Sequence, residues 1–457
     1  MTRIVGVDHG AAAVTSRCVN RNLTTSVRHG FVDDMTAHRT PHPRTTSPAP
    51  PVAPAEPVAP AEPVAPADPT DWRGWIAYGL AWADASRLHR LAQTEQRRVV
   101  EHAVPRVPSG FAAPPHLPSA PSVSARHLTL HAYTEAVPGP RWQALFEATW
   151  PAYRAWYLSE GDAARPTLAQ ARAQLTRHMP ELVPTWERLV ELTAIPLTGT
   201  SRHPDETAAR LLTMWRVPIF AAGCSQIILT GPDARLVRNY DYDAQLFEGV
   251  IASTNYSGTR RVIGTSDMLW GLLDGMNDAG LSVSLTYGGR PGGGDGFAIP
   301  LVLRYLLETC DDVAAAIATL QRIPVAQAYN LALLDTRGGH ATVFVAPGEA
   351  PQVSDLTAST NHRLETVEHP ATAARLRSVP RQQSLLRQLA DGTPSAQIVD
   401  SFTCAPLRSV DYDAGFGTLY TAEYRPAAGT VTYRWPDAVW TRRFDDADDR
   451  RTVALPA

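Results

Sequence analysis

The sequence predicts an α+β fold in which antiparallel sheets are covered by helices, preceded by a mainly helical segment. From residue 224 onward, short β-branched runs alternate with glycine-containing turns, a pattern typical of antiparallel strands. Two helical runs, at about 298–320 and 370–391, interrupt these strands. Strands followed by helices and again by strands indicate layers of sheet and helix. Ahead of residue 224, from about residue 71, apolar residues recur at helical spacing.

Residues 1–70 are expected to form a disordered tail and linker. The stretch PVAPAEPVAPAEPVAPADP, at 51–69, repeats proline, alanine, valine and an acid every six residues. Such a tract favours an extended polyproline II conformation and acts as a semi-rigid spacer. Such a repeat cannot bury a hydrophobic core. A ligand for a proline-binding domain is the alternative interpretation.

Residues 71–223 are predicted to be a mainly helical pro-segment or small chain. Thr167 is placed to cap the helix that follows it. Eight of the eleven tryptophans fall in this segment, and we expect them to pack between helices rather than to stack on a cofactor. The runs with helical periodicity lie at 77–104, 141–161, 181–195 and 205–217.

The composition excludes several classes of function. A net charge of −3 gives no reason to expect binding to nucleic acid or to an anionic membrane. No run of about 18 apolar residues is present, so no membrane span is predicted. The N-terminus lacks a clear secretion signal, which favours the cytoplasm. None of the four cysteines forms a CxxC pair, which argues against a zinc site, and Cys310 and Cys404 are expected to be buried thiols.

The change from helical to strand texture coincides with the Gly223–Cys224 bond, so the catalytic domain, 224–457, is predicted to begin at the cysteine. Glycine lets a thiolate approach its carbonyl, because it has no β-carbon. Attack by Cys224 on that carbonyl gives a thioester, and hydrolysis frees an α-amine with a pKa of about 7.7–8.0. That amine can serve as the general base for its own thiol. A buried structural thiol and a redox-sensing cysteine are the alternatives.

Two charged residues, Arg238 and Asp241, follow the predicted turn at 231–233 and are expected to return beside Cys224 in a hairpin. Their charges complement an ammonium and a thiolate. The alternative is an ordinary strand with a surface salt bridge, since arginine and aspartate three residues apart are common.

Six segments follow one another in the order of the motifs of a known enzyme family. They are GCSQ (223–226), RNYD (238–241), GMNDAGLSVSLTYGGR (275–290), GFAIPLVLRYLLETC (296–310), STNH (359–362) and TRRFDD (441–446). This series resembles the choloylglycine hydrolase and penicillin acylase group of N-terminal nucleophile hydrolases. Within the group it most resembles the acyl-coenzyme A:6-aminopenicillanic acid acyltransferase family, over roughly residues 130–446.

The resemblance implies a four-layer αββα core and a nucleophile, Cys224, that autocleavage after Gly223 exposes. The leading helical part would then stay bound as one chain of a heterodimer. Four further residues receive roles by position. Asp241 would hold the α-amine, Arg238 would support the nucleophile, Asn361 would donate to the oxyanion, and Tyr287 would be a second contributor to the oxyanion site.

A late arginine is also catalytic in some relatives, and Arg408 is a candidate for it. We expect His362, inside the STNH motif, to be a structural hydrogen-bonding residue. The implied function is an autoprocessed cysteine amidohydrolase or acyltransferase that forms an S-acyl-enzyme from a linear amide or an acyl thioester. The sequence does not decide between hydrolysis and acyl transfer. A thioesterase and a catalytically silent binding protein are the alternatives.

No cofactor and no metal are predicted, although acyl-coenzyme A fits as a co-substrate. The expected partners are a small-molecule amide or acyl thioester and the protein's own cleaved N-terminal chain, with no nucleic acid and no membrane.

Overall fold

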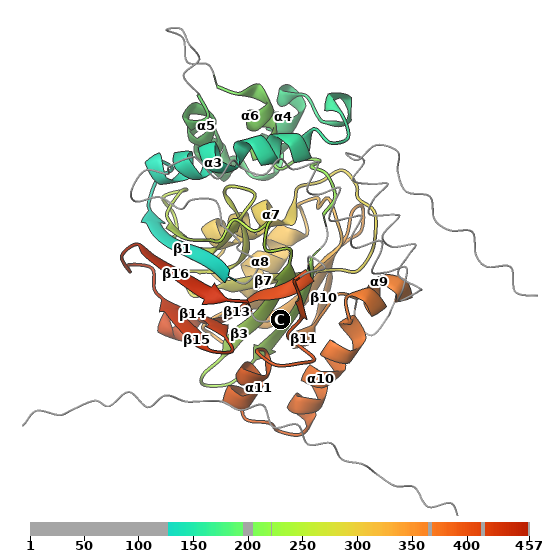
Figure 1. The fold of residues 1–457 in the computed structure, drawn as a ribbon. Helices are drawn as coiled ribbons and strands as arrows, with labels where there is room; N and C mark the ends of the chain where they lie inside the picture. Colours follow the sequence, from blue (N-terminus) through green and yellow to red (C-terminus); the bar gives the residue numbers. More distant parts are fainter. Residues whose placement is uncertain (1–126, 195–203, 221, 364–367, 413–415, 456–457) are drawn as a thin grey trace, which may run out of the picture. The chain divides into compact units, whose positions relative to one another are not determined.

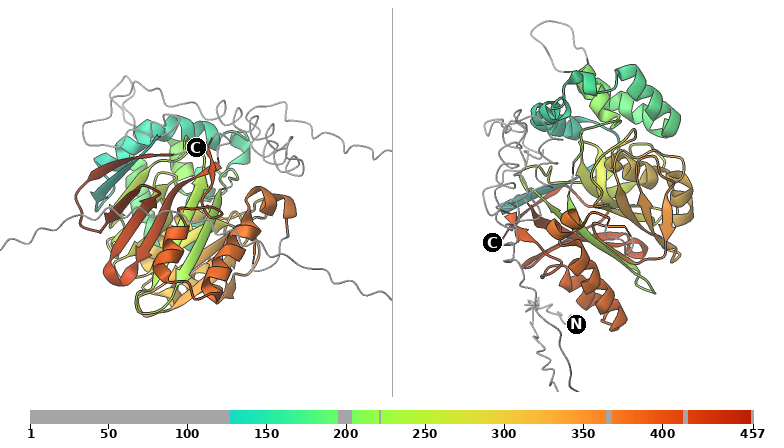
Figure 2. Two further views of the ribbon diagram at one scale, coloured as in Figure 1. Left: turned by 60° about the horizontal axis from the view of Figure 1, so that its bottom comes forward. Right: turned by 90° about the vertical axis from the view of Figure 1, so that its right-hand side faces the viewer.

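The computed structural model describes residues 127–194, 204–220, 222–363, 368–412 and 416–455 (Figure 1). The proline-rich tail and the predicted helix at 77–104 lie outside these residues. Within them, two sheets pack face to face, and helices cover the outer face of each sheet (Figures 1 and 2). The predicted αββα layering is therefore confirmed.

The first sheet has seven strands and contains Cys224. Along its main path the order is β11-β2-β3-β13-β14-β15, and β12 pairs with β13. All of its pairings are antiparallel. The strands are β2 (Gly223–Leu229), β3 (Arg235–Tyr242), β11 (Ala358–Ser359), β12 (Val410–Asp411), β13 (Phe416–Arg425), β14 (Thr430–Trp435) and β15 (Ala438–Arg442).

The second sheet has nine strands in the order β10-β9-β8-β7-β6-β5-β4-β1-β16. Its strands are β1 (His127–Glu135), β4 (Val250–Thr254), β5 (Val262–Asp267), β6 (Gly271–Asn277), β7 (Ser282–Tyr287), β8 (Tyr329–Leu334), β9 (His340–Val345), β10 (Gln352–Ser354) and β16 (Asp449–Ala454). Strand β1 lies parallel to β4 and antiparallel to β16. A strand from ahead of the nucleophile is thus built into this sheet.

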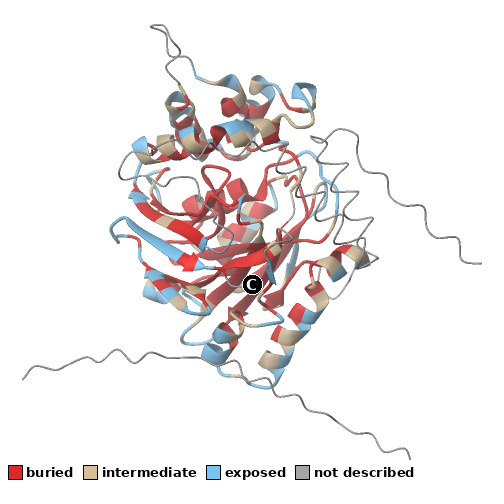
Figure 3. Cartoon of the chain, viewed as in Figure 1, coloured by how far each residue is buried: buried red, intermediate tan, exposed pale blue. Residues whose placement is uncertain are grey.

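Both faces of strands β2 and β3 are buried, and the buried residues include polar and charged ones such as Gln226 and Arg238 (Figure 3). In β2 and β3, Ile228 and Leu236 face the nine-stranded sheet and pack in the core between the sheets. Ile227 and Val237 point the other way and pack with residues of the covering helices, such as Leu385. The alternation of side chains along a strand produces these two cores.

Helices α7 (Ile299–Thr309) and α8 (Val313–Leu320) lie on the nine-stranded sheet, where α7 contacts β5, β6 and β7. On the seven-stranded sheet, α10 (Ser378–Ala390) contacts β2 and β11, and α9 (Pro370–Arg375) and α11 (Ser395–Ser401) are its neighbours in sequence. The helical runs predicted at 298–320 and 370–391 are therefore confirmed, whereas α11 was not foreseen.

The segment ahead of Cys224 contains α3 (Pro140–Tyr157), α4 (Leu168–His178), α5 (Val183–Leu192) and α6 (Glu206–Leu212). Short 3-10 turns are η1 (Asp162–Ala164), η2 (Pro180–Leu182) and, later in the chain, η4 (Pro426–Ala428). Thr167 caps α4 in a capping box with Gln170, as predicted. Trp142 and Trp186 are buried among these helices, and each indole N–H donates to a main-chain carbonyl. Their packing role is confirmed.

The two predicted structural cysteines behave differently. Cys310 is a free, buried thiol, and burial raises the pKa of that thiol. Cys404 is half-buried, so the expectation of a buried thiol is wrong there. Among the described helices, none combines the length and the apolar character needed to cross a bilayer.

Candidate active site

The hairpin of β2 and β3 fixes which residues stand near Cys224. In its antiparallel register, Gly223 is opposite Asp241, Cys224 opposite Tyr240, and Gln226 opposite Arg238. Residues that are directly opposite share a face of the sheet. Cys224 and Arg238 therefore both face the nine-stranded sheet, whereas Asp241 faces the covering helices. The predicted hairpin is therefore present and brings the Arg238 side chain to Cys224, whereas the Asp241 side chain points to the opposite face of the sheet.

Arg238 is fully buried and contacts the candidate nucleophile directly. Its Nη2 lies 3.3 Å from Sγ of Cys224, and its Nε donates to the main-chain oxygen of Leu285 in β7 at 2.8 Å. Its Nη1 forms an ion pair with Asp274 of β6. The guanidinium thus links the thiol to the facing sheet, and the ion pair neutralises the charge that burial would otherwise penalise.

Asp274 is a fully buried carboxylate that holds Arg238 in place. Its oxygens accept hydrogen bonds from the hydroxyls of Tyr420 (2.7 Å), Tyr424 (2.6 Å) and Thr265 (2.8 Å). These donors come from β13 and β5, on opposite sheets. The carboxylate is therefore fully partnered, which is what a buried charge needs to be tolerated.

The Cys224 thiol is buried, and its pKa is raised in the uncut chain. Burial is the main cause, the Arg238 charge opposes it, and the Asp241 charge adds to it. A protonated thiol is a weak nucleophile, so this cysteine needs a base beside it.

Asn361 contacts the main-chain nitrogen of Cys224, the atom that would become an α-amine after cleavage. The Cys224 N–H donates to Oδ1 of Asn361 at 3.1 Å. Nδ2 of Asn361 donates to the main-chain oxygen of Tyr287 at 2.9 Å. An amide nitrogen carries two hydrogens, so one remains for a further acceptor.

The backbone of Asn361 is also held tightly. Its N–H donates to Oγ of Ser378, the first residue of α10, at 2.7 Å. A β-carbon on Gly289, whose φ is +73°, would lie 2.1 Å from the main-chain oxygen of Asn361. Glycine at 289 is therefore required for the strand end to pass this close to Asn361.

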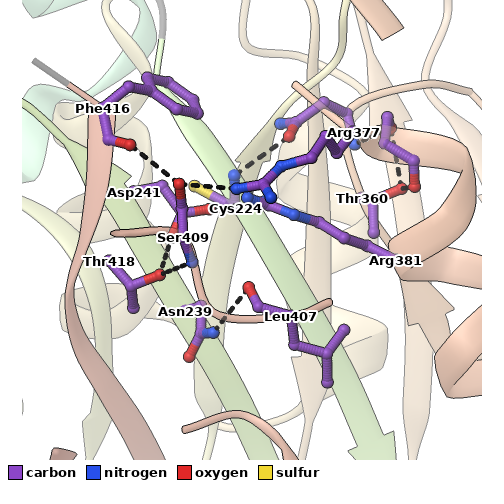
Figure 4. Close-up of polar contacts among 12 residues, drawn as sticks. Cys224, Asn239, Asp241, Thr360, Arg377, Arg381, Leu407, Ser409, Phe416 and Thr418 are labelled. Carbon is purple, nitrogen blue, oxygen red and sulfur yellow. Dashed lines mark hydrogen bonds and ion pairs between the residues drawn. The ribbon is translucent and has the colours of Figure 1, made fainter. Parts of the chain in front are cut away.

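The register of β2 and β3 puts the Asp241 side chain on the opposite face of the sheet from the Cys224 thiol. Its carboxylate pairs with Arg381 of α10 at 2.5 Å and accepts from the hydroxyl of Thr418 of β13 at 2.5 Å (Figure 4). All three side chains are buried. In this arrangement Asn361, rather than Asp241, accepts the hydrogen bond from the Cys224 nitrogen.

Phe416 covers the glycine ahead of the nucleophile. A β-carbon on Gly223 would lie 2.2 Å from Cζ of the Phe416 ring, so any larger residue there displaces the ring. The ring is half-buried, and the main-chain oxygen of Phe416 accepts from Ser409, which in turn accepts from Arg377 (Figure 4).

The remaining candidates, Tyr287, His362 and Arg408, make their side-chain contacts with residues other than Cys224. The Tyr287 ring stacks edge-on against Tyr329, and burial raises the pKa of its hydroxyl to about 12. His362 is buried, and its Nδ1 lies 2.6 Å from Oγ of Ser378, as a structural residue would. Arg408 interacts with the Tyr412 hydroxyl, and no contact joins it to Cys224.

Residues 229–440 match the model of the acyl-coenzyme A:6-aminopenicillanic acid acyl-transferase family. The predicted family resemblance is confirmed. The match to this acyl-transferase family begins after Cys224 and includes Arg238, Asp241 and Asn361. No curated protein sequence matches the chain.

Several solved structures are similar at low identity. Conjugated bile acid hydrolase from Clostridium perfringens, in a mutant form, is 12% identical, with 50% of this chain and 96% of that chain covered and a TM-score of 0.32. An N-acylethanolamine-hydrolyzing acid amidase ortholog from Caenorhabditis elegans is 13% identical, with 48% and 99% covered and a TM-score of 0.33. Penicillin V acylase from Agrobacterium tumefaciens is 12% identical, with 48% and 77% covered and a TM-score of 0.25.

Sequence patterns did not reveal Asp274, Arg381 or Thr418. Asp274 interrupts the apolar run GLLDGMN, and a charged residue inside a buried strand is a usable signal. Arg381 and Thr418 gave no such signal, because each becomes a neighbour of Asp241 only through the tertiary fold.

Proposed function

We propose that this protein is an autoprocessed N-terminal cysteine amidohydrolase or acyltransferase, with Cys224 as its nucleophile. One observation carries the proposal. At the start of β2, the thiol of Cys224 contacts Arg238 while its main-chain nitrogen contacts Asn361, and both partners are buried. The family match is consistent with acyl chemistry on this fold.

Self-cleavage comes first in this proposal. Sγ of Cys224 attacks the carbonyl carbon of Gly223, the C–N bond breaks, and the nitrogen takes up the thiol proton to become an amine. Water then attacks the resulting thioester, which leaves a carboxylate on Gly223 and restores the thiol. Asn361 already accepts a hydrogen bond from that nitrogen and would keep the new amine in place.

Turnover repeats the same chemistry on a small-molecule amide or acyl thioester. The free α-amine takes the proton of the Cys224 thiol, and the sulfur attacks the substrate carbonyl. The second hydrogen on Nδ2 of Asn361 is available for the developing oxyanion. The amine passes the proton to the leaving group, and an S-acyl-enzyme remains. Water releases the acyl group as an acid, whereas an amine acceptor yields a new amide.

The cleaved N-terminal chain would stay bound, because β1 is hydrogen-bonded to strands on both sides. Residues 131–135 pair with β4, and residues 127–132 pair with β16. Both partner strands follow the cleavage point. Tyr153 of α3 also donates to Glu248, so the helices contribute polar contacts across the cut. Release of the chain would expose these groups and break the sheet.

The test is the covalent state of the purified protein. We expect two fragments of similar size that separate only under denaturing conditions, with the later fragment beginning Cys-Ser-Gln-Ile by Edman sequencing. Cys224→Ala should remain one chain and be inactive on amides and thioesters, while Cys310→Ala, the matched control at another buried thiol, should be cleaved normally. A wild-type protein that is active as one uncut chain would disprove self-cleavage.

A further inference from the structure

Arg375, the last residue of α9, lies next to the glycine side of the proposed cleavage point. Its guanidinium carbon is 6.0 Å from the centroid of the Phe416 ring. The same ring rests against Gly223, with its Cζ 2.2 Å from where a β-carbon would be. Arg375, Phe416 and Gly223 therefore form a stack that ends one residue from the nucleophile.

This arginine differs from its neighbours because it has no anionic partner among the described residues. Its Nε is shielded from solvent and makes no hydrogen bond there. By contrast, Arg377 donates to Ser409, and Arg381 pairs with Asp241 although its own Nε and Nη2 make no hydrogen bond to a described residue. A buried donor without a partner carries a free-energy cost, and native structures rarely keep one without a use for it.

The surroundings of Arg375 belong to the candidate active site. Burial lowers the pKa of its guanidinium, and the nearby Tyr287 hydroxyl opposes that shift. Tyr287 is the residue whose main-chain oxygen holds Asn361. Arg375 thus neighbours Phe416, whose ring rests against Gly223, and Tyr287, whose main-chain oxygen holds the Asn361 side chain that contacts the Cys224 nitrogen.

A planar guanidinium is geometrically matched to a carboxylate, to which it can donate two parallel hydrogen bonds. We propose that Arg375 binds a carboxylate on the substrate, so that the protein acts on amides or thioesters that carry this group. The inference rests on the proposed function and adds a substrate class to it. Cleavage would remove the covalent tie at Gly223, and the substrate would occupy the space beside Phe416.

The carboxylate has two sources, the acyl part or the amine part of the substrate, and matched pairs distinguish them. The first pair is an N-acyl amino acid and its uncharged carboxamide. The second pair is a dicarboxylic acid monoanilide and the anilide of the monocarboxylic acid of equal length. The pair in which wild-type protein prefers the charged member identifies the source.

Arg375→Gln should lower kcat/KM for the preferred carboxylate substrate by about 10–100-fold, the range for a charge-assisted hydrogen bond. For the uncharged member of the same substrate pair, kcat/KM should change by less than about threefold. Arg375→Lys should restore part of the kcat/KM that Arg375→Gln loses on the carboxylate substrate. Arg387→Gln is the matched control, since Arg387 is exposed on the adjoining helix α10. An equal fall for both members of a pair, or no fall for either, would overturn the proposal.

Two further measurements separate this proposal from the proposed function. Arg375→Gln should still be cut between Gly223 and Cys224, and failure to cut would assign Arg375 a structural role instead. If wild-type protein turns over no amide or thioester, the carboxylate site can still be tested by binding. Calorimetric titration then compares the affinity for a free monocarboxylate with that for the corresponding carboxamide. Preferential binding of the carboxylate that Arg375→Gln abolishes would support the site, and equal binding would refute it.

Discussion

Replacing Asn361 by alanine tests the oxyanion chemistry separately from the thiol. In the acylation transition state the substrate oxygen becomes an anion, and a side-chain donor stabilises it more than it stabilises the ground state. Loss of one such donor typically costs about 2.7–4 kcal/mol, or about 10²–10³ in kcat. We therefore expect kcat of Asn361→Ala to fall by about that factor with little change in KM.

The same substitution should also lower stability, and the structure gives the size. Asn361 is fully buried, and its loss leaves the Cys224 nitrogen and the Tyr287 carbonyl without their partner. Each unsatisfied buried group costs about 1–3 kcal/mol, so we expect a loss of about 2–6 kcal/mol in the free energy of unfolding. The rate must therefore be measured per folded, cleaved molecule.

Two variants make this assay decisive. Asn330 pins the same segment by donating to the carbonyls of Thr360 and His362, and no contact joins it to Cys224. Asn330→Ala should lower stability without a comparable loss of kcat. Asn361→Asp keeps an acceptor for the Cys224 nitrogen but removes the donor, so it should lose rate as the alanine variant does. A rate loss below about threefold in Asn361→Ala would refute its catalytic role.

Three further predictions concern the buried charges and the cleaved chain. Asp274→Asn leaves Arg238 buried without its counter-ion and should lower the free energy of unfolding by about 3–5 kcal/mol, measured by urea titration in the uncut Cys224→Ala background. As a control, Asp278→Asn, which removes a partly exposed ion pair with Arg261, should lower it by less than about 1 kcal/mol. Equal losses in the two variants would contradict the argument. Cys224→Ser should cut slowly and turn over far more slowly than wild type, since a hydroxyl can attack the same carbonyls, and undiminished turnover would remove the thiol from the mechanism. Burial, together with the nearby Arg450, lowers the pKa of His131 in β1 to about 4. The stability that the neutral His131 contributes is therefore fully present above the ordinary histidine pKa of 6.5 and is lost as pH falls towards 4. The N-terminal chain should dissociate more readily as pH falls through that range, and a His131→Asn variant with the same pH dependence would refute the role of His131.

The sequence allowed some of these features to be predicted because they are local. A turn at 231–233 brings Arg238 back to Cys224, and helical periodicity locates α7 and α10. Strand β1 was not predicted, although Leu128, Leu130 and Ala132 alternate with polar residues and point into the core between the sheets. A period-2 pattern of this length, inside a segment with strong helical signals, is easily overlooked.

The arrangement around the nucleophile depends on information that is not local. Asp241 follows Arg238 by three residues, and this odd spacing puts the two side chains on opposite faces of β3. Asp241 therefore meets Arg381 and Thr418, whereas Asn361 meets the Cys224 nitrogen. Position in a motif predicts which residues belong to the site, but the contacts of each residue depend on the strand register and the tertiary fold.

The central claim is that Cys224 is both an N-terminal residue and the nucleophile, and trapping the acyl-enzyme tests both at once. Wild-type protein is incubated with an activated acyl thioester, quenched in acid and digested, and the acylated peptide is sequenced by tandem mass spectrometry. We predict a peptide that begins at Cys224 with a free α-amine and carries the acyl group on sulfur. An acyl group on Cys310, or on a Cys224 still joined to Gly223, would contradict the account.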